Sequence, residues 1–99
     1  SDQFIILPVS EKYNEYAEKV SEFLNNSDIR GLVDDRNEKV GKKIRDAELK
    51  RVPLMLIIGE KEQTDNTVTV RKQGGEDLGS MSVEAFVAYV NAEIEKQLN

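Results

Sequence analysis

The chain has 99 residues, of which 38% are hydrophobic and 33% charged, with a formal net charge of −5 and neither cysteine nor histidine. This length and composition predict one globular domain with one core, and they exclude an intrinsically disordered chain. The missing residue types remove disulfides, thiolate nucleophiles, histidine general bases and the usual zinc ligands, which argues against catalysis in this chain.

The first part of the chain alternates apolar runs with segments of helical periodicity. Residues 4–9 form a continuous apolar run, which predicts a buried central strand. Ser10 can cap a helix that ends at residues 25–27, and residues 29–33 predict a second strand, with Gly31 as a weak point or bulge. The inward face of the helix is predicted to carry the residues at helical spacing: Tyr13, Tyr16, Ala17, Val20, Phe23 and Leu24.

The rest of the chain continues this alternation. A polar loop at 34–39 leads into a helix that stops before Pro53, followed by a third buried strand at 54–58. Residues 61–66 are predicted to turn the chain, and residues 67–71 alternate as a half-exposed strand. Residues 73–79 are predicted to be a loop with a short edge strand just after it. Ser82 caps a final helix with these residues facing inward: Val83, Phe86, Val87, Val90, Ile94 and Leu98.

This order of elements predicts the α/β class, with helices on both faces of a mixed, mainly parallel sheet. No apolar run approaches the roughly 18 to 20 residues that span a bilayer, and no signal sequence is recognisable, so we expect a cytoplasmic protein without membrane contact. The chain begins without methionine and enters an apolar run at once. We therefore expect a fragment of a longer protein, with a domain at 3–99 preceded by two linker or cloning residues.

Positive charge is concentrated between Arg36 and Arg51, where seven basic residues face three acidic ones. Two interpretations remain open. A local basic face on an otherwise acidic domain can bind phosphates. Alternatively, this is a solvated helix whose charges pair four residues apart, as Lys42 can with Asp46.

Two possible enzyme signatures are weak. The glycine-rich segment 74–79 lacks the Gly-Lys-Ser/Thr ending of a phosphate loop and contains two acids, so a flexible turn explains it better. Asp34 and Asp35 could bind a metal or act in acid–base chemistry, but basic neighbours favour a role in orienting the loop.

A stronger set of candidates flanks the strand ends and the first turns of the second helix: Asn37, Lys39, Arg45, Glu62 and Arg71. The fold should bring these positions onto one rim, and Asn, Arg and Glu are side chains that match the edges of nucleic-acid bases. Gly41 near the helix start permits close approach of a ligand. A cross-strand ion pair between Glu62 and Arg71 is the competing interpretation.

Motifs along nearly the whole chain resemble the C-terminal anticodon-binding domain of threonyl-tRNA synthetase, a class II aminoacyl-tRNA synthetase. They are Leu7-Pro8-Val9-Ser10, Asn14-Glu15-Tyr16-Ala17, Asp35-Arg36-Asn37-Glu38-Lys39-Val40-Gly41, Lys43-Ile44-Arg45, Val52-Pro53-Leu54-Met55-Leu56, Gly59-Glu60-Lys61-Glu62, Val68-Thr69-Val70-Arg71 and Leu78-Gly79-Ser80-Met81. The sequence departs from the family pattern at Lys42 and Leu54, where an aromatic residue and a tyrosine are common.

The resemblance implies a three-layer fold, with about five strands flanked by three helices, that binds the anticodon loop of threonine tRNA. The family reads the central G and the third U of the anticodon. The implied base contacts are Asn37, Arg45, Glu62 and Arg71. Lys39, Lys43 and the helix start at Gly41 are expected to hold the RNA backbone.

The resemblance also implies what lies outside this chain. A catalytic domain of the same polypeptide would activate threonine with ATP and charge the tRNA, using magnesium and zinc, whereas this domain is expected to hold no cofactor and to be inactive alone. The isolated domain is expected to be a monomer and the full-length enzyme a homodimer. The alternative function is a synthetase-like protein-interaction or regulatory module that does not read RNA.

Overall fold

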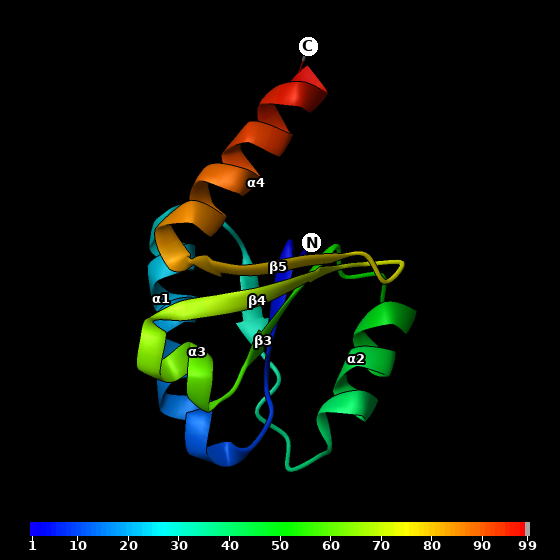
Figure 1. Cartoon of the computed structure of the whole chain (residues 1–99). Helices are drawn as coiled ribbons and strands as arrows, with labels where there is room; N and C mark the ends of the chain where they lie inside the picture. Colours follow the sequence, from blue (N-terminus) through cyan, green and yellow to red (C-terminus); the bar gives the residue numbers. More distant parts are fainter. Residues whose placement is uncertain (99) are drawn as a thin grey trace.

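The computed structural model of the chain describes residues 1–98, which form a five-stranded sheet with helices on both faces (Figure 1). The elements in chain order are β1 (Phe4–Pro8), the 3-10 turn η1 (Glu11–Tyr13), α1 (Asn14–Asn26), β2 (Gly31–Val33), α2 (Val40–Leu49), β3 (Leu54–Ile58), α3 (Glu60–Asp65), β4 (Thr67–Lys72), β5 (Asp77–Ser82) and α4 (Val83–Leu98). The predicted α/β class is confirmed.

The strands lie in the order β2-β1-β3-β4-β5. β1 is parallel to both β2 and β3, while β4 runs antiparallel to β3 and β5. The three parallel strands therefore end at the same edge of the sheet, which we call the carboxyl edge and define by Pro8, Val33 and Ile58. The segments that follow these strands start side by side at that edge.

The core has two parts, one on each face of the sheet, because successive side chains of a strand point to opposite faces. Phe4 and Ile6 of β1 pack on the face covered by α1 and α4. Ile5 and Leu7 pack on the other face, where α2 contributes Ala47. β1 is buried on both faces, as its continuous apolar run predicts, and the molecule has the expected three layers.

Gly31 is required by a close approach rather than by a bulge. It pairs with Phe4 in the parallel β1–β2 ladder. A Cβ atom at this position would overlap the ring and the carbonyl oxygen of Phe4. A side chain here would push β2 away from the buried ring.

Three predictions about the elements were wrong. Residues 60–65 form α3 and not a turn, because Glu62 accepts a hydrogen bond from the Gly59 backbone and so caps a short polar helix. The loop expected at Gln73–Gly79 is shorter than predicted, because the edge strand expected after it, β5, already begins at Asp77 after a tight hairpin with positive φ at Gly74 and Gly75. Ser10 caps the 3-10 turn that precedes α1 instead of α1 itself.

Three apolar side chains that were predicted to face the core are exposed. Phe23 on α1 is 43% exposed, and Ile94 and Leu98 on α4 are 40% and 81% exposed. The last turns of α4 extend past the sheet (Figure 1), and Leu98 is the final residue of this helix. Within residues 1–98, no helix combines the length and apolar character needed to cross a bilayer.

Candidate functional site

The loops at the carboxyl edge surround a hollow of about 520 Å³. One side is formed by residues 9–11 after β1, and the other by the loop between β2 and α2 together with Lys43. Asn37 and Lys39 stand on that loop with exposed side chains. These two predicted site residues therefore line one surface, at the edge where the parallel strands end.

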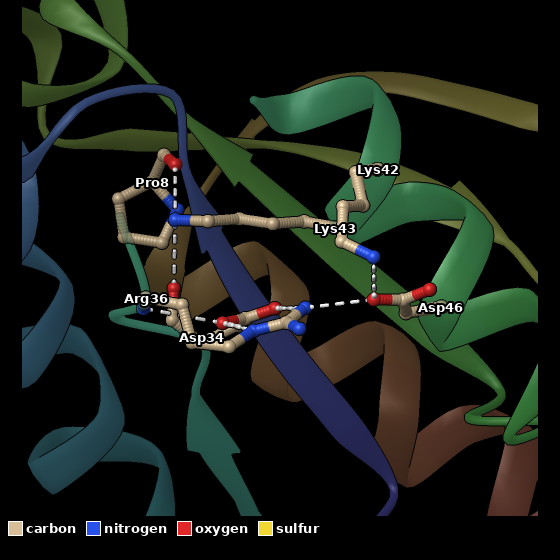
Figure 2. Close-up of polar contacts among 6 residues, drawn as sticks. All are labelled: Pro8, Asp34, Arg36, Lys42, Lys43 and Asp46. Atoms are coloured by element: carbon tan, nitrogen blue, oxygen red, sulfur yellow. Dashed lines mark hydrogen bonds and ion pairs between the residues drawn. The ribbon is translucent and has the colours of Figure 1, made fainter. Parts of the chain in front are cut away.

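The ammonium group of Lys43 is not available on this surface. Its side chain is 2% exposed, and Nζ donates hydrogen bonds to the carbonyl oxygens of Pro8, at 3.1 Å, and Asp34, at 2.9 Å (Figure 2). The ammonium group thus joins the carboxyl ends of β1 and β2. The prediction that Lys43 holds the RNA backbone does not fit this burial, and we assign Lys43 a structural role.

Glu62 has a fixed carboxylate. Oε1 accepts a hydrogen bond from the backbone N–H of Gly59, and Oε2 accepts one from Oγ1 of Thr69, each at 2.8 Å. Burial is the largest single influence on the pKa of Glu62 and raises it, but the hydrogen bonds from Thr69, Gly59 and its own backbone together hold the pKa below its usual value. Glu62 is therefore an ionised acceptor of fixed orientation at neutral pH.

Arg71 and Thr69 lie on the same face of β4 because their side chains are two residues apart. In the sheet they pair with Met55 and Ile57, which belong to the core beneath α2. Beyond α2, this face continues with polar side chains. We call the surface formed by Thr69, Arg71 and the exposed Ser80, which pairs with Thr69, the polar sheet face.

The guanidinium group of Arg71 points toward α2 rather than toward Glu62. Its Nε lies 4.0 Å from Oε2 of Glu48 and has no hydrogen-bond acceptor within the described part of the chain. The competing interpretation, an ion pair between Glu62 and Arg71, was therefore wrong. Each group has a different partner, and both stand on the side of the sheet that α2 occupies.

One face of α2 borders the polar sheet face. Gly41, Arg45 and Glu48 follow at spacings of four and three residues and so share this side of the helix. Glu48 contacts Arg71 and also accepts a hydrogen bond of 3.0 Å from the Gly74 backbone, which orients the face toward β4 and the β4–β5 hairpin. The Arg45 side chain is exposed, and an added Cβ at Gly41 would meet no atom within 4 Å.

The ion pairs of the basic segment follow the solvated-helix interpretation in part, and two of its basic side chains keep exposed charges. Lys42 pairs with Asp46 at 3.7 Å, as the solvated-helix interpretation predicts, and Arg36 binds Asp34 and Asp46. Lys39 and Arg45 appear in no ion pair among residues 1–98 and keep exposed charges. The local positive surface is therefore smaller than the count of basic residues suggests.

Thr69 belongs to this candidate surface but was not among the residues predicted for it. The alternation of residues 67–71 places Thr69 and Arg71 on one face, and this was the signal that could have found it. A larger hollow of about 710 Å³ lies between α1, the end of α3 and the start of α4, and none of the predicted site residues line it. Among the described residues, no cluster of three or more acidic side chains could hold a metal ion.

Residues 3–93 match the family described as "Anticodon binding domain". The chain belongs to this family. It is 59% identical over 97 residues to the threonine–tRNA ligase of Cytophaga hutchinsonii, covering 98% of this chain and 15% of that ligase. It is 54% identical over 98 residues to the threonine–tRNA ligase of Parabacteroides distasonis, covering 99% of this chain and 15% of that ligase.

A solved structure agrees with this membership. The anticodon-binding domain described here superposes on the RNA binding domain of threonyl-tRNA synthetase from Cryptosporidium parvum Iowa II with a TM-score of 0.87 and 29% identity. The match covers 92% of this chain and 23% of that one. The family resemblance seen in the sequence is confirmed, and the chain spans about 15% of the length of the curated ligases it matches.

Proposed function

We propose that this anticodon-binding domain recognises the anticodon loop of threonine tRNA as the RNA-reading part of a threonine–tRNA ligase. The observation that carries the proposal is a fixed acceptor and a donor of complementary charge on the side of the sheet that α2 occupies. The carboxylate of Glu62 is held by Thr69 and Gly59, and the guanidinium group of Arg71 stands on the same face of the sheet. The names of the related ligases support the choice of threonine tRNA.

Each proposed contact follows from the chemistry of its side chain. An ionised glutamate accepts hydrogen bonds from amino or imino groups of a base, and arginine donates a fork to guanine or to phosphate. Anticodon bases are presented unstacked, so that their edges are accessible. We assign base contacts to Asn37, Arg45, Glu62 and Arg71.

Backbone contacts are assigned to a smaller set than the sequence implied. Lys39 offers an exposed charge to phosphate, and the open space at Gly41 permits close approach of the sugar-phosphate chain. Lys43 is left out because its ammonium group binds two backbone carbonyls inside the domain.

The parent protein extends the proposal beyond this chain. We propose that residues 3–99 form the domain, and that a catalytic domain of the same polypeptide activates threonine with ATP and magnesium and binds zinc. The isolated domain is proposed to be monomeric, the full-length ligase a homodimer, and both cytoplasmic. Light scattering of each protein tests the two oligomeric states.

A binding titration tests the function directly. An anticodon stem-loop carrying GGU is titrated against the domain at low and moderate salt, with stem-loops in which the central G or the third U is replaced. We expect salt-sensitive binding that weakens by about 1–3 kcal/mol when either base is changed. Equal binding to all loops would contradict anticodon reading and favour a protein-interaction module.

Protein variants make the test specific to the site. Arg71→Ala and Glu62→Ala are each expected to weaken binding of the GGU loop by about 1–3 kcal/mol. Arg30→Ala and Glu18→Ala are matched controls, since both side chains are exposed and lie outside the site. Site variants that bind as tightly as these controls would show that the assignment is wrong.

A further inference from the structure

The loop between β2 and α2 carries its own set of ionic contacts. Nε and Nη2 of Arg36 donate to the two carboxylate oxygens of Asp34, each at 2.8 Å, and Nη2 also donates to Oδ2 of Asp46 at 3.0 Å (Figure 2). Asp46 lies on α2, ten residues further along the chain. We call Asp34, Arg36 and Asp46 the loop clamp, because they tie the start of the loop to the helix that follows it.

The anchor of this clamp is buried and held from several directions. Asp34 is 9% exposed, and its backbone N–H donates to the carbonyl of Ile6 at 2.9 Å. Its own carbonyl accepts a hydrogen bond from Nζ of Lys43, and its carboxylate accepts one from the backbone N–H of Arg36 at 3.3 Å. Asp34 is therefore fixed to β1, to α2 and to the next turn of the loop.

The tip of the loop differs sharply from its start. Asn37, Glu38 and Lys39 are exposed, and their side chains take part in none of the hydrogen bonds or ion pairs among residues 1–98. The backbone is held nearby, where the Glu38 N–H donates to the carbonyl of Arg36 at 2.9 Å. The clamp thus fixes the backbone while the side chains at the tip stay available to a ligand.

The guanidinium group of Arg36 contacts two carboxylates, so its charge is compensated within the domain. A phosphate would have to compete with both acids for the same hydrogen-bond donors. Arg36 precedes Asn37 in the sequence, but its guanidinium group binds carboxylates of the domain itself and is therefore not counted among the RNA contacts.

We propose that the loop clamp, supported by Lys43, positions the loop so that Asn37 and Lys39 meet RNA in one conformation, without itself contacting RNA. The inference rests on the proposed function for its ligand. It adds positioning residues that act through the loop, because a recognition loop that is already ordered loses less entropy on binding. In this proposal the clamp residues of the segment hold the loop, whereas Asn37 and Lys39 contact the RNA.

The principal test is the substitution Arg36→Lys, which keeps the charge and removes the two-pronged contact with Asp34. We expect binding of the GGU stem-loop to weaken by on the order of three- to tenfold, with an unchanged dependence on salt concentration. Arg30→Lys is the matched control and should bind as the unsubstituted chain does. Binding by Arg36→Lys that equals this control would overturn the proposal.

A double-mutant cycle separates positioning from general weakening of the fold. Asn37→Ala and Lys39→Ala are each measured alone and combined with Arg36→Lys. If Arg36 acts through the loop, the loss caused by Arg36→Lys shrinks once the tip residues are removed. If Arg36→Lys weakens binding by the same factor with and without the tip substitutions, Arg36 does not act through Asn37 or Lys39.

Amide hydrogen exchange tests the clamp without RNA. The backbone amides of Arg36 and Glu38 should exchange faster in Arg36→Lys, while the Gly75 amide in the hairpin keeps its rate. Unchanged exchange at both loop amides would overturn the inference even if RNA binds. Absence of RNA binding by the unsubstituted chain would overturn the proposed function, and the exchange rates would still decide whether the clamp exists.

Asp46→Asn is a second variant, which removes the charge through which Asp46 on α2 pairs with Arg36 and with Lys42. It keeps the pair between the exposed Arg36 and the buried Asp34 and is therefore expected to stay folded if Arg36→Lys does not. We expect this variant also to bind the GGU stem-loop more weakly and to exchange the loop amides faster, with smaller changes than Arg36→Lys. Unchanged binding and exchange in this variant would exclude Asp46 from the clamp.

Discussion

Glu62 and Thr69 are joined by a hydrogen bond of 2.8 Å that links the side chain of a helix residue to that of a strand residue. The other oxygen of the same carboxylate caps α3 through the backbone of Gly59. One side chain therefore stabilises the α3–β4 connection and, in the proposed function, presents an acceptor to RNA. Replacing the hydroxyl group of Thr69 tests the link to β4 by itself, because the Glu62 carboxylate and its hydrogen bond to Gly59 remain.

The substitution Thr69→Val is expected to raise the pKa of Glu62 toward its usual value, since a hydrogen bond that favours the ionised form is lost. A lowered pKa in the folded state means that this contact stabilises the fold at neutral pH and that the contribution is lost as the pH falls through that pKa. We expect Thr69→Val to cost about 1 kcal/mol at pH 7, and less as the pH falls through the lowered pKa of Glu62.

Urea unfolding at several pH values and an NMR titration of the Glu62 carboxyl carbon measure both effects. Thr64→Val is the matched control because Thr64 is exposed on α3. A pKa of Glu62 that is the same in Thr69→Val as in the unsubstituted chain would show that the hydroxyl does not lower it.

Lys43→Met is expected to destabilise the domain by about 1–3 kcal/mol, because it leaves the carbonyls of Pro8 and Asp34 without their buried donor. Methionine has a similar length, so packing along the side chain is largely preserved. Lys50→Met, at an exposed position, is expected to change stability by less than about 0.5 kcal/mol. Equal effects of the two substitutions on urea unfolding would contradict the structural role of Lys43.

Gly31→Ala is expected to destabilise the domain by about 1–3 kcal/mol. The added methyl group would overlap the ring and backbone of Phe4, and the buried ring cannot move freely in a packed core. The midpoint of thermal unfolding measures the effect. A midpoint equal to that of the unsubstituted chain would mean that β2 shifts without cost.

Gly41→Ala is expected to have opposite effects on stability and on RNA binding. Alanine has room at this helical position and should stabilise the domain by several tenths of a kcal/mol. If the RNA backbone approaches here, the methyl group should weaken binding of the GGU stem-loop. A variant that gains stability and keeps its affinity would remove Gly41 from the proposed site.

Local signals in the sequence predicted several elements correctly. The apolar runs at β1 and β3 predicted buried strands, and the alternation of residues 67–71 predicted a half-exposed one. Ser82 was predicted to cap the last helix, and its Oγ accepts a hydrogen bond of 3.0 Å from the Ala85 backbone. These features depend on neighbours within a few residues, which is why a pattern can reveal them.

The helix α3 was missed because a segment of six residues that are all polar has no apolar stripe. Its stability comes from the Glu62 cap and from contact with β4, neither of which produces a periodic pattern. The exposure of Phe23 was missed for the opposite reason. Phe23 follows the helical period of α1, but the buried side of this helix consists of Ala17, Val20, Ser21 and Leu24. Phe23 lies beside it and lines the hollow between α1, the end of α3 and the start of α4.

The sequence by itself determined the class of fold, the family and most of the residues on the candidate surface, because hydrophobic period and family motifs are properties of local stretches. Only the tertiary structure decided which charges are available. Lys39 and Lys43 are similar in sequence context, yet Lys39 is exposed and Lys43 is buried against the ends of two strands. A charged side chain takes the partners that folding brings to it, and for Lys43 one of them is 35 residues away.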